Sequence, residues 1–180
     1  MDDVPSPEDA VRRHITDDNI TSTVVYNTPT PHVLTSRFNT ETWSENEAYR
    51  NKHGTDGCIY GCPLRISHKV GSNTLAYVLE MNNTTNLIEG VGVIRNYPNF
   101  DQPDWIYGDN NYNRYIYTGR RRMNRDELIR YDTDLVQHIE TVCFTGKTHL
   151  KRGAGLTLVP NKFLRMTHGT NHEPRNPHTV

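Results

Sequence analysis

Apolar and polar residues alternate along several short stretches of the chain, which is typical of β-strands with one buried face. The clearest alternation covers residues 74–82, and a second apolar run over 87–96 follows a turn rich in asparagine and threonine. Gly90 and Gly92 lie two residues apart in this second run and indicate a bent strand or a close backbone approach. Further strands are expected at residues 23–26, 33–38, 58–66, 112–119 and 156–160.

Two segments have the pattern of a short helix. Residues 42–50 offer Thr42 or Ser44 as the N-cap and place acidic side chains in the first turn. Asn124 is expected to cap a second helix that continues through residue 139. No repeat and no alternating βαβ rhythm is present, so we expect an α+β domain with a small curved, mostly antiparallel sheet or small barrel and two short helices.

The length of 180 residues fits one compact domain, which we place at residues 23–168. Residues 1–22 are polar and proline-bearing and predict a flexible N-terminal arm, and residues 169–180 predict a disordered tail. The hydrophobic share is 34%, and no run approaches the roughly 18 apolar residues of a membrane helix. The acidic start lacks the apolar stretch of a signal peptide. We therefore expect an intracellular protein with no membrane partner.

Charge is distributed unevenly along the chain, although the formal net charge is only -1. Residues 1–110 carry 8 Lys/Arg against 15 Asp/Glu, whereas residues 111–180 carry 12 against 6. The basic half is either an electrostatic footprint for phosphate or the folding partner of the acidic half.

Motifs for catalysis and metal binding are incomplete. Gly146-Lys147-Thr148 resembles the end of a phosphate-binding loop, but position 141 is threonine where that loop needs glycine. The Cys58/Cys62 spacing is a weak zinc signal, although a mixed Cys/His set can be drawn, and buried apolar cysteines are the alternative. We assign no catalytic residue, no metal ligand and no cofactor. If the protein is an enzyme, Glu80, Glu89 or His149 is the acid-base group to test.

Basic and aromatic residues alternate in the second half of the chain and form the main candidate site. Aromatic planes can stack on bases while guanidinium and ammonium groups hold the phosphates. The candidate nucleic-acid-binding residues are Trp105, Arg114, Tyr115, Tyr117, Arg120, Arg121, Arg122, Lys147, His149, Lys151 and Arg152. If residues 147–152 are extended, Lys147, His149 and Lys151 form a basic stripe on one face. The structural alternative is a tyrosine-rich strand packed on its sheet, with arginines paired to acidic neighbours.

The order of three motifs resembles that of PUA-like domains of the ASCH and EVE kind. These are Cys58-Ile59-Tyr60-Gly61-Cys62-Pro63, Val78-Leu79-Glu80-Met81-Asn82-Asn83, and Ile88-Glu89-Gly90-Val91-Gly92-Val93-Ile94. The tyrosine-rich strand, the segment 146–153 and Pro160 also resemble uncharacterised proteins of large nucleocytoplasmic DNA viruses. The resemblance covers about residues 23–165 and implies a PUA-like barrel that binds RNA or a modified base. The viral likeness implies a virion or viral-factory role.

These observations lead to two functional hypotheses. The first is a non-enzymatic nucleic-acid-binding module that uses the tyrosine-arginine strand and the basic, glycine-containing segment. The second is a viral structural or virion-associated interaction protein whose arms cover neighbouring viral proteins. A viral protein would lie in the host cytoplasm or nucleus, or in the virion.

Overall fold

The computed structural model describes residues 32–99 and 105–167. The expected arm at 1–22, the strand at 23–26 and the tail at 169–180 lie outside these residues. The elements follow one another along the chain as β1 (His32–Phe38), α1 (Thr40–Lys52), β2 (Cys58–Cys62), β3 (Leu75–Asn82), β4 (Leu87–Arg95), the 3₁₀ turn η2 (Asn110–Asn113), β5 (Tyr115–Gly119), β6 (Arg121–Asn124), α2 (Arg125–Tyr131), α3 (Thr133–Phe144), β7 (Thr157–Leu158) and α4 (Asn161–Thr167).

The strands form a five-stranded sheet in the order β6-β4-β3-β1-β7 and a separate pair, β2-β5. Neighbouring strands are antiparallel except for β1 and β3, which are parallel. The protein is therefore an α+β fold with a mostly antiparallel sheet, as the sequence predicts. The sheet is open, so the alternative expectation of a closed barrel is not met by the described strands.

One bend in the chain joins the two sheets. β5 pairs with β2, and β6, which begins after the single residue Arg120, pairs with β4. At the bend the backbones are close, because a Cβ built on Gly119 would lie 1.8 Å from the Val93 carbonyl oxygen. Residues 121–124 carry no clear strand pattern, and they join the sheet because this bend delivers them to the edge of β4.

The first helix begins earlier than the sequence suggested. Asn39 is its N-cap, and its Oδ1 accepts a hydrogen bond from the Thr42 backbone N–H at 2.8 Å. Thr42 completes a capping box, since its Oγ1 accepts from the Asn39 backbone N–H at 3.0 Å. The expectation of Thr42 or Ser44 as the cap was therefore wrong by about one turn, because Thr42 fills the reciprocal position of the box.

The helical segment after residue 124 is divided into two helices. Asn124 caps α2 as predicted, with its Oδ1 accepting from the Glu127 N–H at 2.9 Å. The predicted continuous helix is interrupted at Asp132, whose backbone is extended and whose carboxylate caps α3 through the Leu135 N–H. With α4 in addition, the described part of the chain has four α-helices where two were expected.

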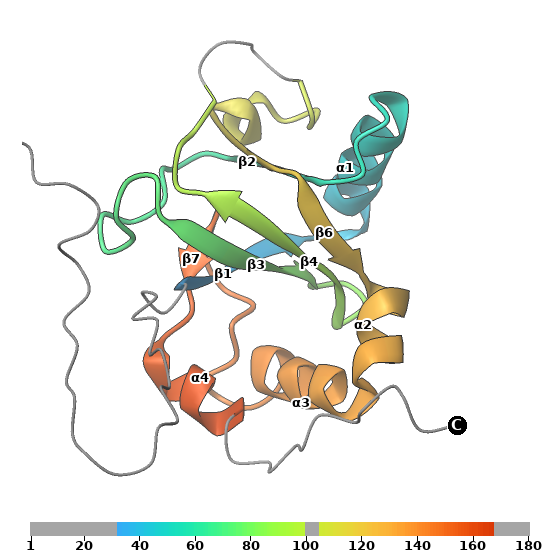
Figure 1. The fold of residues 1–180 in the computed structure, drawn as a ribbon, viewed down its shortest axis with the longest axis vertical. Helices are drawn as coiled ribbons and strands as arrows, with labels where there is room; N and C mark the ends of the chain where they lie inside the picture. The colour runs from blue at the N-terminus through green and yellow to red at the C-terminus, as the bar shows by residue number, and fades with distance from the viewer. Residues whose placement is uncertain (1–31, 100–104, 168–180) are drawn as a thin grey trace, which may run out of the picture.

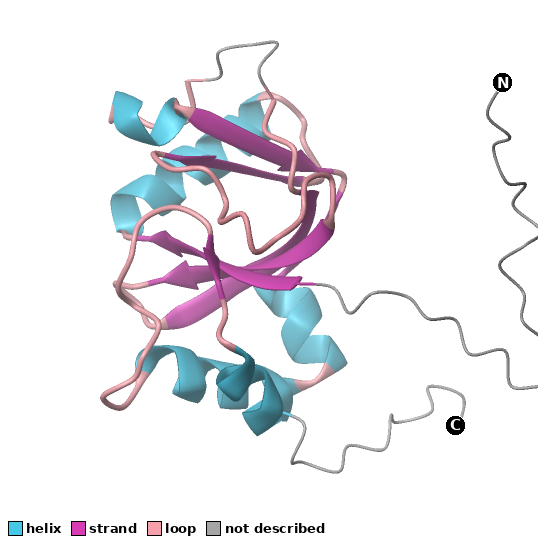
Figure 2. Cartoon of the chain, turned by 90° about the vertical axis from the view of Figure 1, so that its left-hand side faces the viewer, coloured by secondary structure: helices cyan, strands magenta, loops and turns pink. Residues whose placement is uncertain are grey.

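Two hydrophobic clusters hold these elements together. The larger one lies between the five-stranded sheet, the β2-β5 pair and α1, and includes Leu34, Tyr60 and Val78. The smaller cluster packs the α3 residues Cys143 and Phe144 against Met81 and Ile88. Figures 1 and 2 show the corresponding layers, with α2, α3 and α4 gathered at one end of the sheet and α1 beside the β2-β5 pair.

Within residues 32–99 and 105–167, none of the helices has the length and apolar character needed to cross a membrane.

Gly92 is a position where side chains of β2 pack directly against the backbone of β4. A Cβ at this position would lie 2.1 Å from the Tyr60 Oη and 2.6 Å from the Cys58 Sγ. We expect Gly92→Ala to lower the free energy of unfolding by about 3 kcal/mol, because the β2-β5 pair must move away from β4. Urea denaturation monitored by circular dichroism measures the loss.

Gly71→Ala is the matched control, because Gly71 is exposed and its nearest neighbour is the end of the Thr74 side chain at 3.0 Å. Its expected change is within about 0.5 kcal/mol. Equal losses for both variants would contradict the close packing at Gly92.

Candidate functional site

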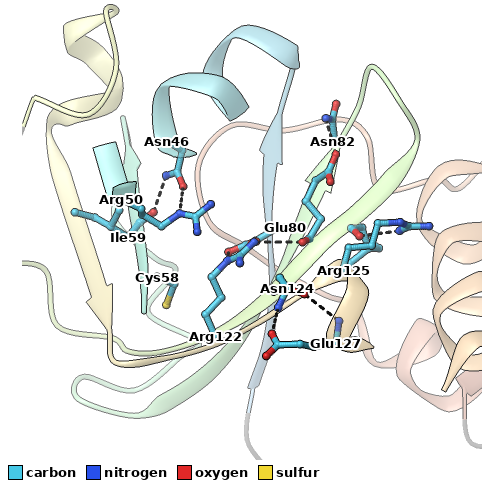
Figure 3. A network of polar contacts seen from close by, with 12 residues as sticks. Asn46, Arg50, Cys58, Ile59, Glu80, Asn82, Arg122, Asn124, Arg125 and Glu127 are labelled. Carbon is cyan, nitrogen blue, oxygen red and sulfur yellow. Dashed lines mark hydrogen bonds and ion pairs between the residues drawn. The ribbon is translucent and has the colours of Figure 1, made fainter. Parts of the chain in front are cut away.

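A largely buried ion pair lies between the sheet and the β2-β5 pair. The Arg122 Nη2 donates to the Glu80 Oε2 at 2.7 Å, and its Nε donates to both carboxylate oxygens at 3.0 and 3.1 Å. The Tyr60 hydroxyl donates to the Glu80 Oε1 at 2.7 Å. Glu80 is 1% exposed and the Arg122 side chain 9% exposed. Both carboxylate oxygens therefore have partners and Glu80 is shielded from solvent. Figure 3 shows the contact between Glu80 and Arg122.

Local chain geometry makes room for this ion pair. The register between β3 and β4 shifts between Glu80 and Met81. A Cβ on Gly90 would lie 2.6 Å from the Glu80 Oε2 and 2.7 Å from the Arg122 Nη2, so any larger residue there would displace the pair. The close backbone approach that the sequence predicted at Gly90 and Gly92 is confirmed, and its purpose is to seat the Glu80 carboxylate and the Tyr60 hydroxyl.

A second buried arginine faces the ion pair from α1. The Arg50 Nε donates to the Asn46 Oδ1 at 3.1 Å, and the Asn46 amide donates to the Ile59 carbonyl at 2.8 Å. Arg50 points toward Glu80 and Arg122 (Figure 3), and both guanidinium groups lie within 5.7 Å of the Trp43 ring centroid. Burial, followed by the charge of Arg122, lowers the pKa of the Arg50 guanidinium. One carboxylate thus faces two cations in this network.

Burial and the neighbouring charges together shift the pKa values of the groups in this network. Burial alone would lower the pKa of Arg122, but the hydrogen bonds and the charge of Glu80 raise it overall. Burial and then the Glu80 charge raise the pKa of the Tyr60 hydroxyl well above its ordinary value. The network therefore keeps Tyr60 as a neutral hydrogen-bond donor and Arg122 as a cation, which suits a structural support.

Arg122 occupies a different place from the one expected for it. The sequence grouped it with Arg120 and Arg121 as a phosphate ligand, but its guanidinium points inward to Glu80 because side chains alternate along β6. Tyr117 is also inside, with 0% exposure, and its hydroxyl accepts from the Ile66 N–H at 3.1 Å. In this conformation neither side chain is accessible for contact with a ligand.

Two of the predicted residues lie in a broad surface groove of about 940 Å³. Arg120 and Arg121 form part of its wall and are exposed. The sequence did not single out Arg95 and Tyr97, which come from the end of β4 and line the same groove. Tyr97 is 65% exposed. Tyr49 and His53, stacked with ring centroids 4.2 Å apart, close the groove on the α1 side.

The remaining predicted aromatic and basic residues are dispersed. Trp105 is 67% exposed and does not line the groove. Arg114 lies over the half-buried Tyr115 ring at 5.9 Å from its centroid. The structure therefore separates Tyr115 and Arg114 from Arg120 and Arg121.

The basic segment 147–152 forms a loop and not the extended stripe that alternation suggested. Lys147 and Arg152 are exposed, whereas His149 is partly buried and its Nδ1 accepts from the Lys151 N–H at 3.2 Å. The Lys151 Nζ donates to the Asn86 Oδ1 at 2.8 Å in the turn between β3 and β4. The loop is held by this turn and lies away from the groove residues.

The three cysteine thiols are all free and buried. Burial raises the pKa of Cys58 and of Cys62 to about 11, and that of Cys143 to about 12. Among the described residues, no group of three or more His, Cys, Asp or Glu side chains could hold a metal ion. The thiols accordingly behave as small apolar groups of the two cores.

Comparison of the chain with protein-family models, with curated proteins and with solved structures finds no match. The resemblance to PUA-like domains and to viral proteins thus stays a prediction. The function has to be argued from the geometry of the groove and its surroundings.

Replacing Glu80 by glutamine tests the structural role of the ion pair. The variant leaves the Arg122 cation buried without its counter-charge, and we expect a loss of about 3–5 kcal/mol in the free energy of unfolding. Urea denaturation at pH 7 measures it. Glu41→Gln, which removes an exposed carboxylate from the first turn of α1, is the control and is expected to cost less than about 1 kcal/mol. A near-zero loss for Glu80→Gln would show that the pair is dispensable.

The thiols provide a second test, through pH. A folded-state pKa above the ordinary value of 9.0 favours the neutral thiol in the native protein. The stabilisation is complete below pH 9 and is lost as the pH rises toward 11–12, because the unfolded chain releases its thiol protons first. We expect no rapid reaction with a disulfide reagent at pH 8 in the native state and three reactive thiols in urea. A rapidly reacting thiol in the native protein would contradict this.

Proposed function

We propose that the protein binds single-stranded nucleic acid in the groove lined by Arg95, Tyr97, Arg120 and Arg121. The observation that carries this proposal is the convergence of three exposed arginines and an exposed tyrosine on one groove of about 940 Å³. These residues come from two separate parts of the chain, the end of β4 and the β5-β6 bend. Their convergence is a product of the fold and not of sequence proximity.

The charge of the groove suits a phosphate backbone. Asp56 is the only carboxylate among its lining residues, against the three guanidinium groups. The Arg95 Nη1 donates to the Asn73 carbonyl at 2.9 Å, which fixes the direction of its side chain. Guanidinium groups hold phosphate oxygens through paired N–H donors, so they position a strand without reading its sequence.

Aromatic and apolar surface next to the arginines suits unpaired bases. Tyr97 offers its ring at the groove, and Leu75 of β3 is 45% exposed in the same wall. Tyr77, 43% exposed, is in register with Val93, and Val93 is in register with Arg121. Such a row across β3, β4 and β6 gives a strand both stacking and phosphate contacts, which is the pattern of single-strand binding.

The proposal is for binding without catalysis. Cys58 lines the groove but is 1% exposed, and its raised pKa of about 11 keeps it protonated. Glu80, the acid-base candidate from the sequence, is sealed in its ion pair.

The double variant Arg120→Ala/Arg121→Ala tests the proposal. Wild-type protein is expected to bind labelled 12-nucleotide RNA or DNA at low salt, with an affinity that falls as salt rises. Loss of two phosphate contacts should weaken binding and reduce the slope of log K against log salt by about 1.4. Fluorescence anisotropy over a series of salt concentrations measures both quantities, and the two oligonucleotides distinguish RNA from DNA.

Lys69→Ala/Arg130→Ala is the charge-matched control, because both residues are exposed and neither lines the groove. It should leave the slope within experimental error of wild type. Absence of wild-type binding at low salt, or equal effects of the two double variants, would overturn the proposal.

A further inference from the structure

A second, smaller pocket lies at the other end of α1 from the groove. Its volume is about 200 Å³, several times the roughly 30 Å³ of one water molecule. The end of β1, the first turn of α1, β2 and the loop after residue 150 form its walls. Thr42 lines this pocket and His53, the C-cap of α1, lines the groove. The two residues are eleven positions apart along the helix, which corresponds to roughly 16 Å. The two sites are therefore independent.

Arg37 is the one charged side chain in the lining of this pocket. Its Nε donates to the Leu150 carbonyl at 2.6 Å, which holds the guanidinium in place. Its Nη1 is buried and has no hydrogen-bond partner, and within the described residues Arg37 forms no ion pair. Burial lowers the pKa of the guanidinium. Arg37 is a half-buried cation without a counter-charge, and an anion in the pocket would offset the cost of removing it from water.

Asn83 supplies a second unsatisfied atom in the same lining. Its Nδ2 donates to the Lys151 carbonyl at 3.0 Å. Because a carbonyl only accepts, this bond fixes the orientation of the amide and leaves the Oδ1 as the free acceptor. The Oδ1 is buried and unpartnered. Two residues in the lining of the pocket, Arg37 and Asn83, thus each carry a buried polar atom without a partner.

The remaining walls are aromatic side chains and glycine backbone. Phe38, Tyr107 and Tyr112 line one part, and the two tyrosine rings lie edge to face, 6.1 Å apart. Gly153 and Gly155 have φ angles of +117° and +67°, which side-chain-bearing residues rarely adopt, and Gly153 lies against the Arg37 guanidinium. Glycine at position 153 lets the backbone pass close to the guanidinium, since a Cβ there would lie 3.4 Å from the Arg37 Cζ. A flat ring suits the aromatic wall.

We propose that this pocket binds a small organic oxyanion, a phosphate or carboxylate carried on a flat ring, with the positive charge of Arg37 in the pocket wall holding the anion. The first turn of α1 adds its dipole, although the capping box already uses its backbone donors at Asn39 and Thr42. The proposal does not depend on nucleic-acid binding in the groove.

Isothermal titration of the full chain tests this with four probes: uridine monophosphate, 4-hydroxybenzoate, inorganic phosphate and uridine. We expect one site per chain for at least one of the two ring-bearing anions, weaker binding of inorganic phosphate, and no binding of uridine. A preference for the first or the second probe identifies the anion as phosphate or carboxylate. Binding of neither at millimolar concentration, or binding of uridine as tight as that of its phosphate, would overturn the proposal.

Arg37→Gln should weaken the bound probe roughly 10- to 100-fold, because a charge-assisted hydrogen bond is lost. Arg152→Gln is the control: it removes the same charge from an exposed neighbour that does not line the pocket. Equal weakening by both would indicate a general charge effect and would overturn the assignment to Arg37. The groove variant Arg120→Ala/Arg121→Ala should bind the probe as wild type does, which separates this proposal from the previous one.

A second pair of variants tests the proposal even if Arg37→Gln fails to fold. Glutamate is a favoured residue at the capping-box position that Thr42 occupies, so Thr42→Glu should keep α1 intact while adding a negative charge beside the pocket. Thr42→Glu is expected to abolish anion binding with an unchanged melting temperature. Its neutral counterpart, Thr42→Gln, should retain binding. Retained binding in Thr42→Glu would overturn the proposal.

Discussion

The Glu80–Arg122 ion pair is the constraint on which the arrangement of the two sheets depends. Removing two charges from water is expensive, and the cost is offset only where every polar atom finds a partner. Tyr60 from β2, Arg122 from β6 and the Glu89 carbonyl from β4 meet at or around one carboxylate. Such an ion pair is favourable in only one relative position of β2, β3, β4 and β6. It therefore contributes more to the specificity of the packing than to the stability of the fold.

Much of the secondary structure could be predicted from the sequence, because alternation and capping are local signals. The strands at 75–82 and 87–95 and the Asn124 cap are each determined by neighbours within a few residues. The strand at 121–124 depends on a partner distant in the sequence, whereas the hydrogen bonds at the Asp132 break are local, to Leu128 and Leu135. Asp132 sits inside an otherwise helical pattern, and β6 becomes a strand only beside β4.

The sequence predicted two of the four residues on which the groove proposal rests. Arg120 and Arg121 stand out in a run of three arginines. The sequence gives no sign that the third, Arg122, turns inward, since that depends on pairing with β4 and on Glu80, 42 residues earlier. Arg95 and Tyr97 are isolated in the chain and become significant only where β4 ends beside the β5-β6 bend. Tyr117 is an aromatic residue of the kind that stacks on bases, but it is buried in β5, which pairs with β2.

The position of β7 has a consequence for the synthesis of the protein. β1 pairs with β3 on one side and with β7 on the other, and the Thr35 and Thr157 hydroxyls that meet there are 122 residues apart in the chain. While the chain is being made, β1 and β3 can pair long before β7 leaves the ribosome. In that interval one side of β1, which carries Val33 and Leu34, is an unpaired strand edge open to other nascent chains. A two-residue strand near the end of the chain is thus what closes this edge to association.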